Sequence, residues 1–366
     1  MSRRKLLFYT HGLVAGGAER VFARLASGFS ARGDDVVFVV DYDAQANRGH
    51  LDASVDYRVL PAGHARGARA LARMLAQEQP AASLSAIAVS NLKHAAAALL
   101  AGRRSRAILG YHGFYESEPE RLSNIGYRLT PQIVRACAAT VAVSHALRAD
   151  LIDRFRAPPE KVVAIYNPAA PEPFPPALGH ADLAARPPRL LAMGRLVRDK
   201  DFATLIGALA LMKTRDAELV ILGEGPERGA LEKAVAAANL QGRVRLPGYC
   251  ADTGAELDAA RCFVVSSLRE TFSLACVEAL AHGLPAIVTD CGGPPEIVNA
   301  AALGAVVPTG DAAALARALD DALAAPGDPA ARQARARDFT LETALDAYDA
   351  LIERLAHGAA PGASSA

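Results

Sequence analysis

The sequence predicts an α/β protein of two doubly wound, Rossmann-like domains that face each other across a cleft. Length is the first observation, because 366 residues, 51% of them hydrophobic, are enough for two separate cores. The second is a recurring order of short apolar run, polar or glycine-rich loop and helix-like segment, which is typical of parallel sheets. The third is residues 168–188, whose seven prolines predict a stiff, irregular connector between the domains.

Residues 266–296 are the most informative stretch. The apolar run 262–265 predicts a buried strand, residues 266–271 a polar loop and residues 272–281 a helix. Glu270 then lies just before the helix, and Glu278 lies two turns further on. The N–H groups of residues 271–274 suit an anion, and the carboxylates suit hydroxyl groups. A nucleotide sugar, with a phosphate beside a polyhydroxylated ring, meets both demands.

This block carries a family resemblance. Glu270 and Glu278, followed by His-Gly-Leu-Pro at 282–285 and Gly-Gly-Pro-Pro-Glu at 292–296, resemble the nucleotide-sugar signature of family 4 retaining glycosyltransferases (glycosyltransferase group 1) of GT-B fold. The resemblance covers nearly the whole chain and is loose only in residues 40–110. It implies retaining transfer of a sugar from a nucleoside diphosphate sugar, with a UDP-sugar favoured, to a lipid-linked or cell-surface glycan acceptor.

The resemblance also implies the site. Four residues match catalytic positions of the family: His112, Arg195, Lys200 and Glu270. Of these, the histidine would lie near the 6-position of the sugar, the two cations at the diphosphate and the carboxylate at the sugar hydroxyls. The residues expected to bind the donor are Gly16, Gly17, Gly223, Gly225, Tyr249, Phe272, Ser273, Leu274 and Glu278.

Two loops support these positions independently. Arg195 and Lys200 follow the strand expected at 189–193, where a planar fork and a point charge can clamp a diphosphate. A glycine loop at 12–17 joins the strand expected at 5–10 to a helix that runs to about residue 31. Its glycine spacing is not Gly-x-Gly-x-x-Gly, so a nicotinamide site is not predicted.

The same residues bear on metals and cofactors. Asp41 and Asp43 form an Asp-x-Asp pair, a pattern that holds a divalent metal in the other large glycosyltransferase fold. Such turns also occur at the edge of any doubly wound sheet, and Arg195 and Lys200 supply the positive charge that the leaving diphosphate needs. We therefore expect no metal and no cofactor, with the nucleotide sugar as co-substrate.

The predicted domains are an acceptor-side domain (1–170), a nucleotide-sugar-binding domain (171–338) and a C-terminal helix (339–357) that crosses back to the first domain. Besides the strands already named, we expect strands at residues 35–40, 55–60, 86–90, 106–111, 139–144, 218–222, 244–247 and 284–289, with 139–144 the last strand of the first domain. Residues 168–188 are expected to be irregular, the chain after residue 308 to be helical, and the small, polar tail from His357 to be disordered.

Charge is uneven along the chain. Residues 1–170 hold 22 Lys and Arg against 14 Asp and Glu, a net +8, and the remaining residues hold 18 against 25, a net −7. A basic half implies an anionic lipid surface or a phosphorylated substrate as partner. Nucleic acid is not expected, because aromatic residues are only 5% of the chain and no recognition helix is present.

Location follows from the same observations. No apolar run approaches the length of a membrane span, and residues 1–30 lack a signal-peptide pattern, which predicts a cytoplasmic protein. Arg66, Arg69 and Arg73 recur at helical spacing and could rest on the inner face of the cell membrane, or form a solvated face. Two other function classes stay open: a sugar-nucleotide epimerase of GT-B fold and a non-catalytic sugar-nucleotide-binding protein.

Overall fold

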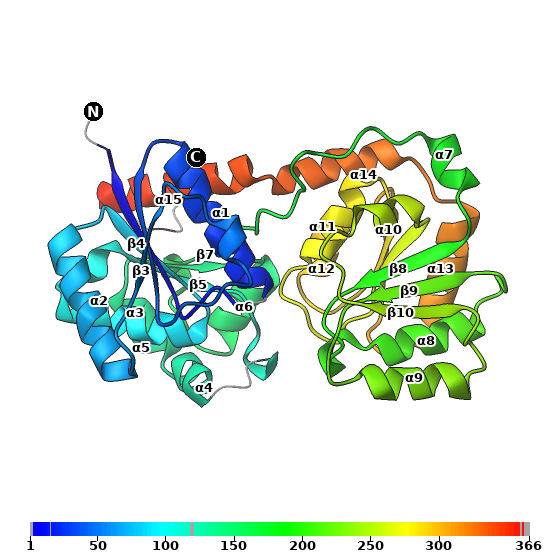
Figure 1. Ribbon diagram of the computed structural model, residues 1–366, viewed down its shortest axis with the longest axis horizontal. Coiled ribbons are helices and arrows are strands. Elements are labelled where there is room, and N and C mark those ends of the chain that lie inside the picture. Colours follow the sequence, from blue (N-terminus) through cyan, green and yellow to red (C-terminus); the bar gives the residue numbers. More distant parts are fainter. Residues whose placement is uncertain (1–2, 15, 118–120, 359–360, 362–366) are drawn as a thin grey trace. The chain divides into compact units, whose positions relative to one another are not determined.

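The computed structural model describes residues 3–14, 16–117, 121–358 and 361, and it divides into two compact units (Figure 1). The first unit comprises Met1–Pro168 together with Leu341–Ala366, and the second comprises Ala169–Thr340. Each unit is built on one parallel sheet flanked by helices, so the two doubly wound domains predicted from the sequence are confirmed.

The sheet of the first unit has seven parallel strands. They are β1 (Lys5–Thr10), β2 (Asp35–Val40), β3 (Asp56–Val59), β4 (Ala82–Ala86), β5 (Ala107–Tyr111), β6 (Ala139–Ala142) and β7 (Val162–Ala164). Their order in space is β3-β2-β1-β4-β5-β6-β7. The chain therefore winds outward from β1 in one direction and from β4 in the other, which makes the β1–β4 junction the switch point of this sheet.

Helices cover both faces of that sheet. They are α1 (Gly17–Ala31), α2 (His64–Glu78), α3 (Ala88–Leu100), α4 (Arg121–Arg128), α5 (Thr130–Ala136), α6 (His145–Asp153) and α15 (Leu341–Ala356). Successive residues of a strand point to opposite faces. Phe8 of β1 accordingly packs on Phe22 and Phe29 of α1, and Tyr9 meets His94 of α3, so α1 and α3 lie on opposite sides.

The last helix, α15, packs on the first. Leu345 is fully buried, and a Cβ atom added to Gly28 of α1 would come within 2.7 Å of its Cδ1, so the glycine permits the close approach. Ion pairs join Arg32 of α1 to Asp346 at 2.6 Å and to Asp349 at 2.9 Å, and Asp349 also pairs with Arg4 at 2.6 Å. Including the net −3 of residues 341–366 lowers the basic excess of the first unit from +8 to +5.

The sheet of the second unit has six parallel strands. They are β8 (Arg189–Met193), β9 (Glu218–Leu222), β10 (Val244–Gly248), β11 (Cys262–Val265), β12 (Ala286–Thr289) and β13 (Gly304–Val307), in the spatial order β10-β9-β8-β11-β12-β13. Its helices are α7 (His180–Ala185), α8 (Phe202–Leu211), α9 (Arg228–Ala237), α10 (Gly254–Ala259), α11 (Leu274–Ala281), α12 (Pro294–Ile297), α13 (Ala312–Ala324) and α14 (Pro329–Ala336). Strand and helix residues from Leu190 to Leu323 form one hydrophobic core.

Some predicted elements are wrong. The strand expected at 86–90 is in fact β4, which ends at Ala86, and α3 begins at Ala88. Ser83 and Ser85 obscured β4 because they are polar, yet both are buried and hydrogen-bonded to His94 of α3, at 2.8 and 2.9 Å. The connector contains the short helix α7, and strands β7 and β13 were not predicted.

The expected C-terminal helix begins two residues late, at Leu341. Phe339 stays with the second unit, because its ring meets that of Phe272 at 5.6 Å and its carbonyl accepts hydrogen bonds from Ala169 and Ala170. The chain therefore passes from the first unit into the second at Ala169, and returns to the first unit after Thr340.

Candidate functional site

The switch point of the second sheet lies between β8 and β11. Strands β9 and β10 follow β8 to one side, and β12 and β13 follow β11 to the other. In such sheets the loops at the carboxyl ends of the two central strands part to form a crevice where ligands bind. The loop after β8 carries Arg195 and Lys200, and the loop after β11 carries Glu270.

Two of the predicted catalytic residues meet there. Lys200 Nζ donates to Glu270 Oε1 at 2.7 Å, and the hydroxyl of Ser267 donates to Glu270 Oε2 at 2.8 Å. The lysine side chain is 24% exposed and the glutamate side chain 11%. The carboxylate is therefore held by a cation on one oxygen and a hydroxyl on the other, with one side of the pair still open to solvent.

Buried hydrogen bonds fix the backbone around this pair. Glu270 N donates to Cys291 O at 2.9 Å, and Gly293 N donates to Glu270 O at 2.8 Å, so the loop after β11 is strapped to the loop after β12. The hydroxyl of Ser266 donates to Lys200 O at 2.8 Å. Two loops that are 70 residues apart in sequence thus form one rigid frame, which is what an oriented ion pair requires.

Glycine is required where these loops touch. A Cβ atom on Gly293 would lie 2.0 Å from Thr271 O, although the backbone φ of Gly293 is ordinary. A Cβ atom on Gly223 would lie 1.9 Å from Gly194 O, and one on Gly225 would lie 2.4 Å from Leu196 O. The two glycines expected to bind the donor therefore have a packing role that the structure shows directly: they let the loops after β8 and β9 come into contact.

Helix α11 begins close to Glu270. The prediction placed its start at Phe272, but Ser273 is the N-cap, and its hydroxyl accepts from Cys276 N at 3.4 Å, so the first helical residue is Leu274. Phe272 packs its ring into the unit, which leaves backbone groups for any contact with a ligand. The first N–H groups of a helix have no partner inside it, so the start of α11 suits an anion beside Glu270.

The other site residues expected in the second unit lie at the same end of the sheet or on α11. Arg195 is exposed, and no described residue is hydrogen-bonded or ion-paired to its guanidinium. Tyr249 follows β10 and is 79% exposed. Glu278 is half-buried on α11. The structure thus brings Lys200 and Glu270 into direct contact and leaves Arg195 and Tyr249 facing solvent.

In the first unit, His112 directly follows β5, at the carboxyl edge of the sheet. Burial lowers the pKa of its imidazole to about 4. The ring is therefore neutral near pH 7, with one nitrogen able to donate a hydrogen bond and the other able to accept one.

The predicted glycine loop also reaches this edge, at the start of α1. Gly16 is the N-cap, and a Cβ atom on it would lie 2.2 Å from Glu19 Oε2. The buried Glu19 carboxylate therefore already lies at the positive end of the helix, and a phosphate at Gly16 and Gly17 would meet its negative charge. Asn47 braces the same loop through hydrogen bonds from its side-chain amide to Val14 O and Gly16 O.

The Asp-x-Asp pair is engaged in the protein itself. Lys93 Nζ lies 2.6 Å from Asp41 Oδ2, and the hydroxyl of Tyr9 donates to both oxygens of that carboxylate at 3.1 Å. Asp43 accepts from the Tyr57 hydroxyl at 3.0 Å. In the described part of the chain, no three His, Cys, Asp or Glu side chains gather in a way that could hold a metal ion.

Sequence reasoning missed Ser267, Ser266 and Asn47. Ser267 stands three residues before Glu270, a spacing that lets a hydroxyl reach a carboxylate within one turn of chain, and this signal was available. The sequence carries no such signal for Ser266 and Asn47, because their hydrogen-bond partners, Lys200 and Val14, are far away in sequence. None of the helices that the structure describes has both the length and the hydropathy needed to span a membrane.

Family models match both halves of the chain. The model described as Glycosyltransferase Family 4 matches residues 15–172, and the model described as Glycosyl transferases group 1 matches residues 180–339. The two matched segments correspond closely to the two halves that meet at the connector.

Two curated relatives and one solved structure illustrate the similarity. The chain is 36% identical over 143 residues (39% of this chain, 42% of the relative) to the lipopolysaccharide core biosynthesis glycosyltransferase LpsE of Rhizobium meliloti (strain 1021). It is 34% identical over 146 residues (38% of each chain) to N-acetylgalactosamine-N,N'-diacetylbacillosaminyl-diphospho-undecaprenol 4-alpha-N-acetylgalactosaminyltransferase of Campylobacter jejuni subsp. jejuni serotype O:2 (strain ATCC 700819 / NCTC 11168). The matches span about two fifths of each relative's length.

The solved structure is Anabaena Alr3699/HepE in complex with UDP and glucose. It superposes with a TM-score of 0.80 and 20% identity over 96% of this chain and 100% of that chain. At this identity the likeness shows a shared two-domain fold.

Proposed function

We propose that the protein, which belongs to glycosyltransferase family 4 (the group 1 glycosyl transferases) and has the GT-B fold, transfers a sugar from a nucleoside diphosphate sugar to a glycan acceptor. The observation that carries the proposal is the Lys200–Glu270 pair at the switch point, beside the start of α11. A cation, a carboxylate and a helix N-terminus together suit a diphosphate joined to a hydroxylated ring.

In this proposal the second unit binds the donor. The diphosphate would lie between Lys200 and the first N–H groups of α11, and the guanidinium of Arg195 would complete the clamp. Glu270 would accept hydrogen bonds from the sugar hydroxyls, and Glu278 from the ribose. Uridine is the favoured base, in line with the UDP bound by Alr3699/HepE.

The chemistry requires stabilisation of a leaving group. When the bond between the anomeric carbon and the diphosphate oxygen breaks, negative charge grows on the diphosphate and positive charge on the sugar ring. Fixed positive charge and N–H dipoles at the leaving oxygen lower that barrier. Arg195, Lys200 and the start of α11 supply both, so the proposed reaction proceeds without a metal or other cofactor.

Retention at the anomeric carbon is part of the proposal. His112, neutral because burial lowers its pKa to about 4, would donate a hydrogen bond near the 6-position of the sugar without adding charge beside the cationic ring. No pair of carboxylates with the separation of a hydrolase acid and nucleophile was predicted in the sequence, which favours transfer over hydrolysis.

The proposed class of acceptor is inferred from the names of two relatives. One relative is named for lipopolysaccharide core biosynthesis, and the other for a sugar carried on diphospho-undecaprenol. We propose an acceptor of the same class, a lipid-linked or cell-surface glycan intermediate met at the inner face of the cell membrane, with no nucleic acid partner. The basic excess of the first unit, +5, supports an anionic partner on that side.

A product assay tests the function. Purified protein is incubated with radiolabelled UDP-glucose, UDP-galactose or their N-acetylated forms and an extract of lipid-linked glycans, and the products are separated by phase partition. Transfer of label to the glycan fraction with release of UDP is expected. Label that remains in a sugar nucleotide of altered stereochemistry would instead select an epimerase, and donor binding without turnover would select a binding protein.

A further inference from the structure

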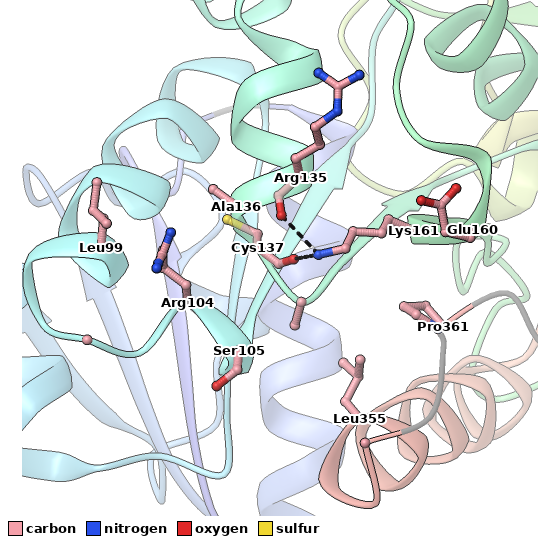
Figure 2. Close-up of a pocket in the computed structure, with 13 residues that line it drawn as sticks. Leu99, Arg104, Ser105, Arg135, Ala136, Cys137, Glu160, Lys161, Leu355 and Pro361 are labelled. Atoms are coloured by element: carbon pink, nitrogen blue, oxygen red, sulfur yellow. Dashed lines mark hydrogen bonds between the residues drawn. The ribbon is translucent and has the colours of Figure 1, made fainter.

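A pocket opens at the amino edge of the first sheet, the edge opposite to His112. Its volume is about 720 Å³. The lining comes from the segments before β5, β6 and β7 and from the end of α15 (Figure 2). None of these segments has a part in the proposed donor chemistry, since ligands of parallel sheets bind at the carboxyl edge.

Positive charge surrounds this pocket. Arg104 and Arg135 line it, Arg103 and Arg106 flank Arg104 in the same turn, and the only acidic side chain among the described lining residues is that of Glu160. No described residue forms an ion pair with any of these four guanidinium groups. This edge therefore carries a local excess of uncompensated positive charge.

The charges spread outward instead of converging on one point. Lys161 Nζ donates to the carbonyl oxygens of Arg135, at 3.0 Å, and Cys137, at 2.6 Å, so this lysine braces the chain at the pocket (Figure 2). The guanidinium of Arg135 points away from Lys161. A single small anion would be held by converging donors, whereas this arrangement fits an extended anionic surface.

Two leucines stand exposed beside the arginines. Leu99 and Leu100 end α3 and are 55% and 68% exposed, and Leu99 lines the pocket. The fold does not need them there, because α3 packs through other residues such as Ala95 and Ala98. Adjacent exposed leucines next to basic residues are the composition of an interfacial membrane contact.

Helix α2 lacks this combination. Arg66, Arg69 and Arg73 are exposed, as the sequence suggested, but Leu71 and Leu75 on its apolar side are fully buried in the first unit. A helix that lies on a bilayer inserts its apolar side. Helix α2 therefore offers charge to a surface but no apolar group.

We propose that the amino edge of the first unit docks on an anionic phospholipid bilayer. Leu99 and Leu100 enter the boundary between headgroups and acyl chains, and Arg103, Arg104, Arg106 and Arg135 contact lipid phosphates around the pocket. Binding is strongest at low salt and on acidic lipids, because screening weakens each arginine contact.

This docking constrains the acceptor. Strand β5 separates the pocket, before Ala107, from His112, and its five residues span about 17 Å. With the amino edge on the bilayer, the proposed site at His112 lies about one strand length away from it, and the reacting sugar with it. This inference about the acceptor, unlike the docking, rests on the proposed glycosyl transfer. If that transfer is correct, the acceptor is a lipid-linked oligosaccharide of several sugars, because the first sugar on a lipid phosphate would not reach the site at His112.

Vesicle sedimentation tests the docking on the full chain, without reference to activity. The probes are phosphatidylcholine vesicles with and without an equal amount of phosphatidylglycerol. The variants are Leu99→Ser with Leu100→Ser, Arg103→Gln with Arg104→Gln, and the matched control Arg66→Gln with Arg69→Gln, which removes the same charge from α2. Circular dichroism melting and UDP binding check that each variant is folded.

The native protein is expected to sediment with the acidic vesicles only. Each of the first two variants should bind roughly tenfold more weakly, and the control should change by less than about threefold. The proposal is overturned if the native protein stays in solution, if the control loses binding as much as the other variants, or if both variants bind normally. It is also overturned if free glycerol phosphate at low concentration displaces the protein from vesicles, since that result identifies a site for a soluble phosphate.

Discussion

Lys200 Nζ lies 2.7 Å from Glu270 Oε1, although the two residues were expected at different parts of the donor, the diphosphate and the sugar. The ion pair places the two side chains within reach of one another, and a diphosphate and a sugar are likewise adjacent in a nucleotide sugar. It also means that each residue holds the other in place before a ligand arrives. In the proposed function, donor binding would separate this pair, with the diphosphate contacting the lysine and the sugar hydroxyls contacting the glutamate.

Replacing Lys200 by Ala should lower kcat by roughly 10²- to 10³-fold, because one fixed positive charge is lost at the leaving diphosphate. Steady-state kinetics with saturating donor measures this. Lys213→Ala, an exposed lysine of the same unit, is the matched control and should have native kinetics. Adding Glu270→Gln to Lys200→Ala should recover thermal stability, since it removes the unpaired carboxylate, without recovering activity. Recovery of both would contradict the assigned role.

Substitution of the two glutamates should have different effects on the affinities for UDP and for the UDP-sugar. Glu278→Gln should weaken UDP and the whole UDP-sugar equally, because both ligands carry the ribose. Glu270→Gln should leave UDP affinity near native and weaken the UDP-sugar, roughly tenfold for a lost hydrogen bond to a charged group. Isothermal titration calorimetry with both ligands makes the comparison, and the opposite pattern would exchange the two roles.

Turnover should persist in excess EDTA, since Arg195 and Lys200 provide the charge that a divalent ion supplies in other enzymes. Rates are compared after chelation and after addition of Mg²⁺ or Mn²⁺. If chelation abolishes turnover and either ion restores it, the metal-free mechanism is wrong, and Asp41 and Asp43 become the first residues to test.

Gly293→Ala should disrupt the donor loop through lack of space alone, because its φ is ordinary and the added Cβ would lie 2.0 Å from Thr271 O. We expect a loss of about 1–3 kcal/mol in the free energy of unfolding and a weaker affinity for UDP. Gly229→Ala is the control: this glycine lies in α9 with no atom within 4 Å of the added Cβ. The control should be neutral or stabilising by up to about 1 kcal/mol. Urea denaturation of both variants measures the two changes in the free energy of unfolding.

Acid should destabilise the first unit through the buried His94 and the partly buried His112. Burial lowers the pKa of His112 to about 4 and that of His94 to about 3. The unfolded chain then binds more protons than the folded chain below the ordinary histidine pKa of 6.5. The stability due to the neutral rings is complete above that value and is lost as pH falls toward 4. His94→Asn should flatten the dependence of the urea midpoint on pH across this window, and exposed His64→Asn should leave it unchanged.

The strand and helix around Glu270 were predicted well because their signals are local. Residues 262–265 are a strand as expected, and Glu270, Ser273 and Glu278 lie around one helix start within a few turns of chain. The Lys200–Glu270 contact was not predicted, because it depends on β8 lying next to β11, and nothing in the residues of either strand specifies that neighbour.

The first unit was harder to predict for a different reason. The Ser83–His94–Ser85 cluster buries polar groups that pattern reasoning assigns to the surface, so β4 was displaced by several residues. The carboxylate of Glu19 at the start of α1 was also unforeseen, because glycine spacing describes the backbone and says nothing of which side chain fills the space beside it. The misplaced strand and the unpredicted carboxylate have one cause: in both, polar side chains are buried in tertiary contacts, where sequence patterns place such side chains in solvent.

Helix α15 has a consequence for synthesis as well as for stability. Its buried Leu345 and its ion pairs with Arg4 and Arg32 complete a unit whose sheet comes entirely from residues 5–164. Domains of a nascent chain tend to fold in the order in which they emerge from the ribosome. Here the sheet that emerges first must wait, with the surface of α1 uncovered, until all of the second unit has been made. The second unit, continuous from Ala169 to Thr340, can therefore reach its final fold before the first one does.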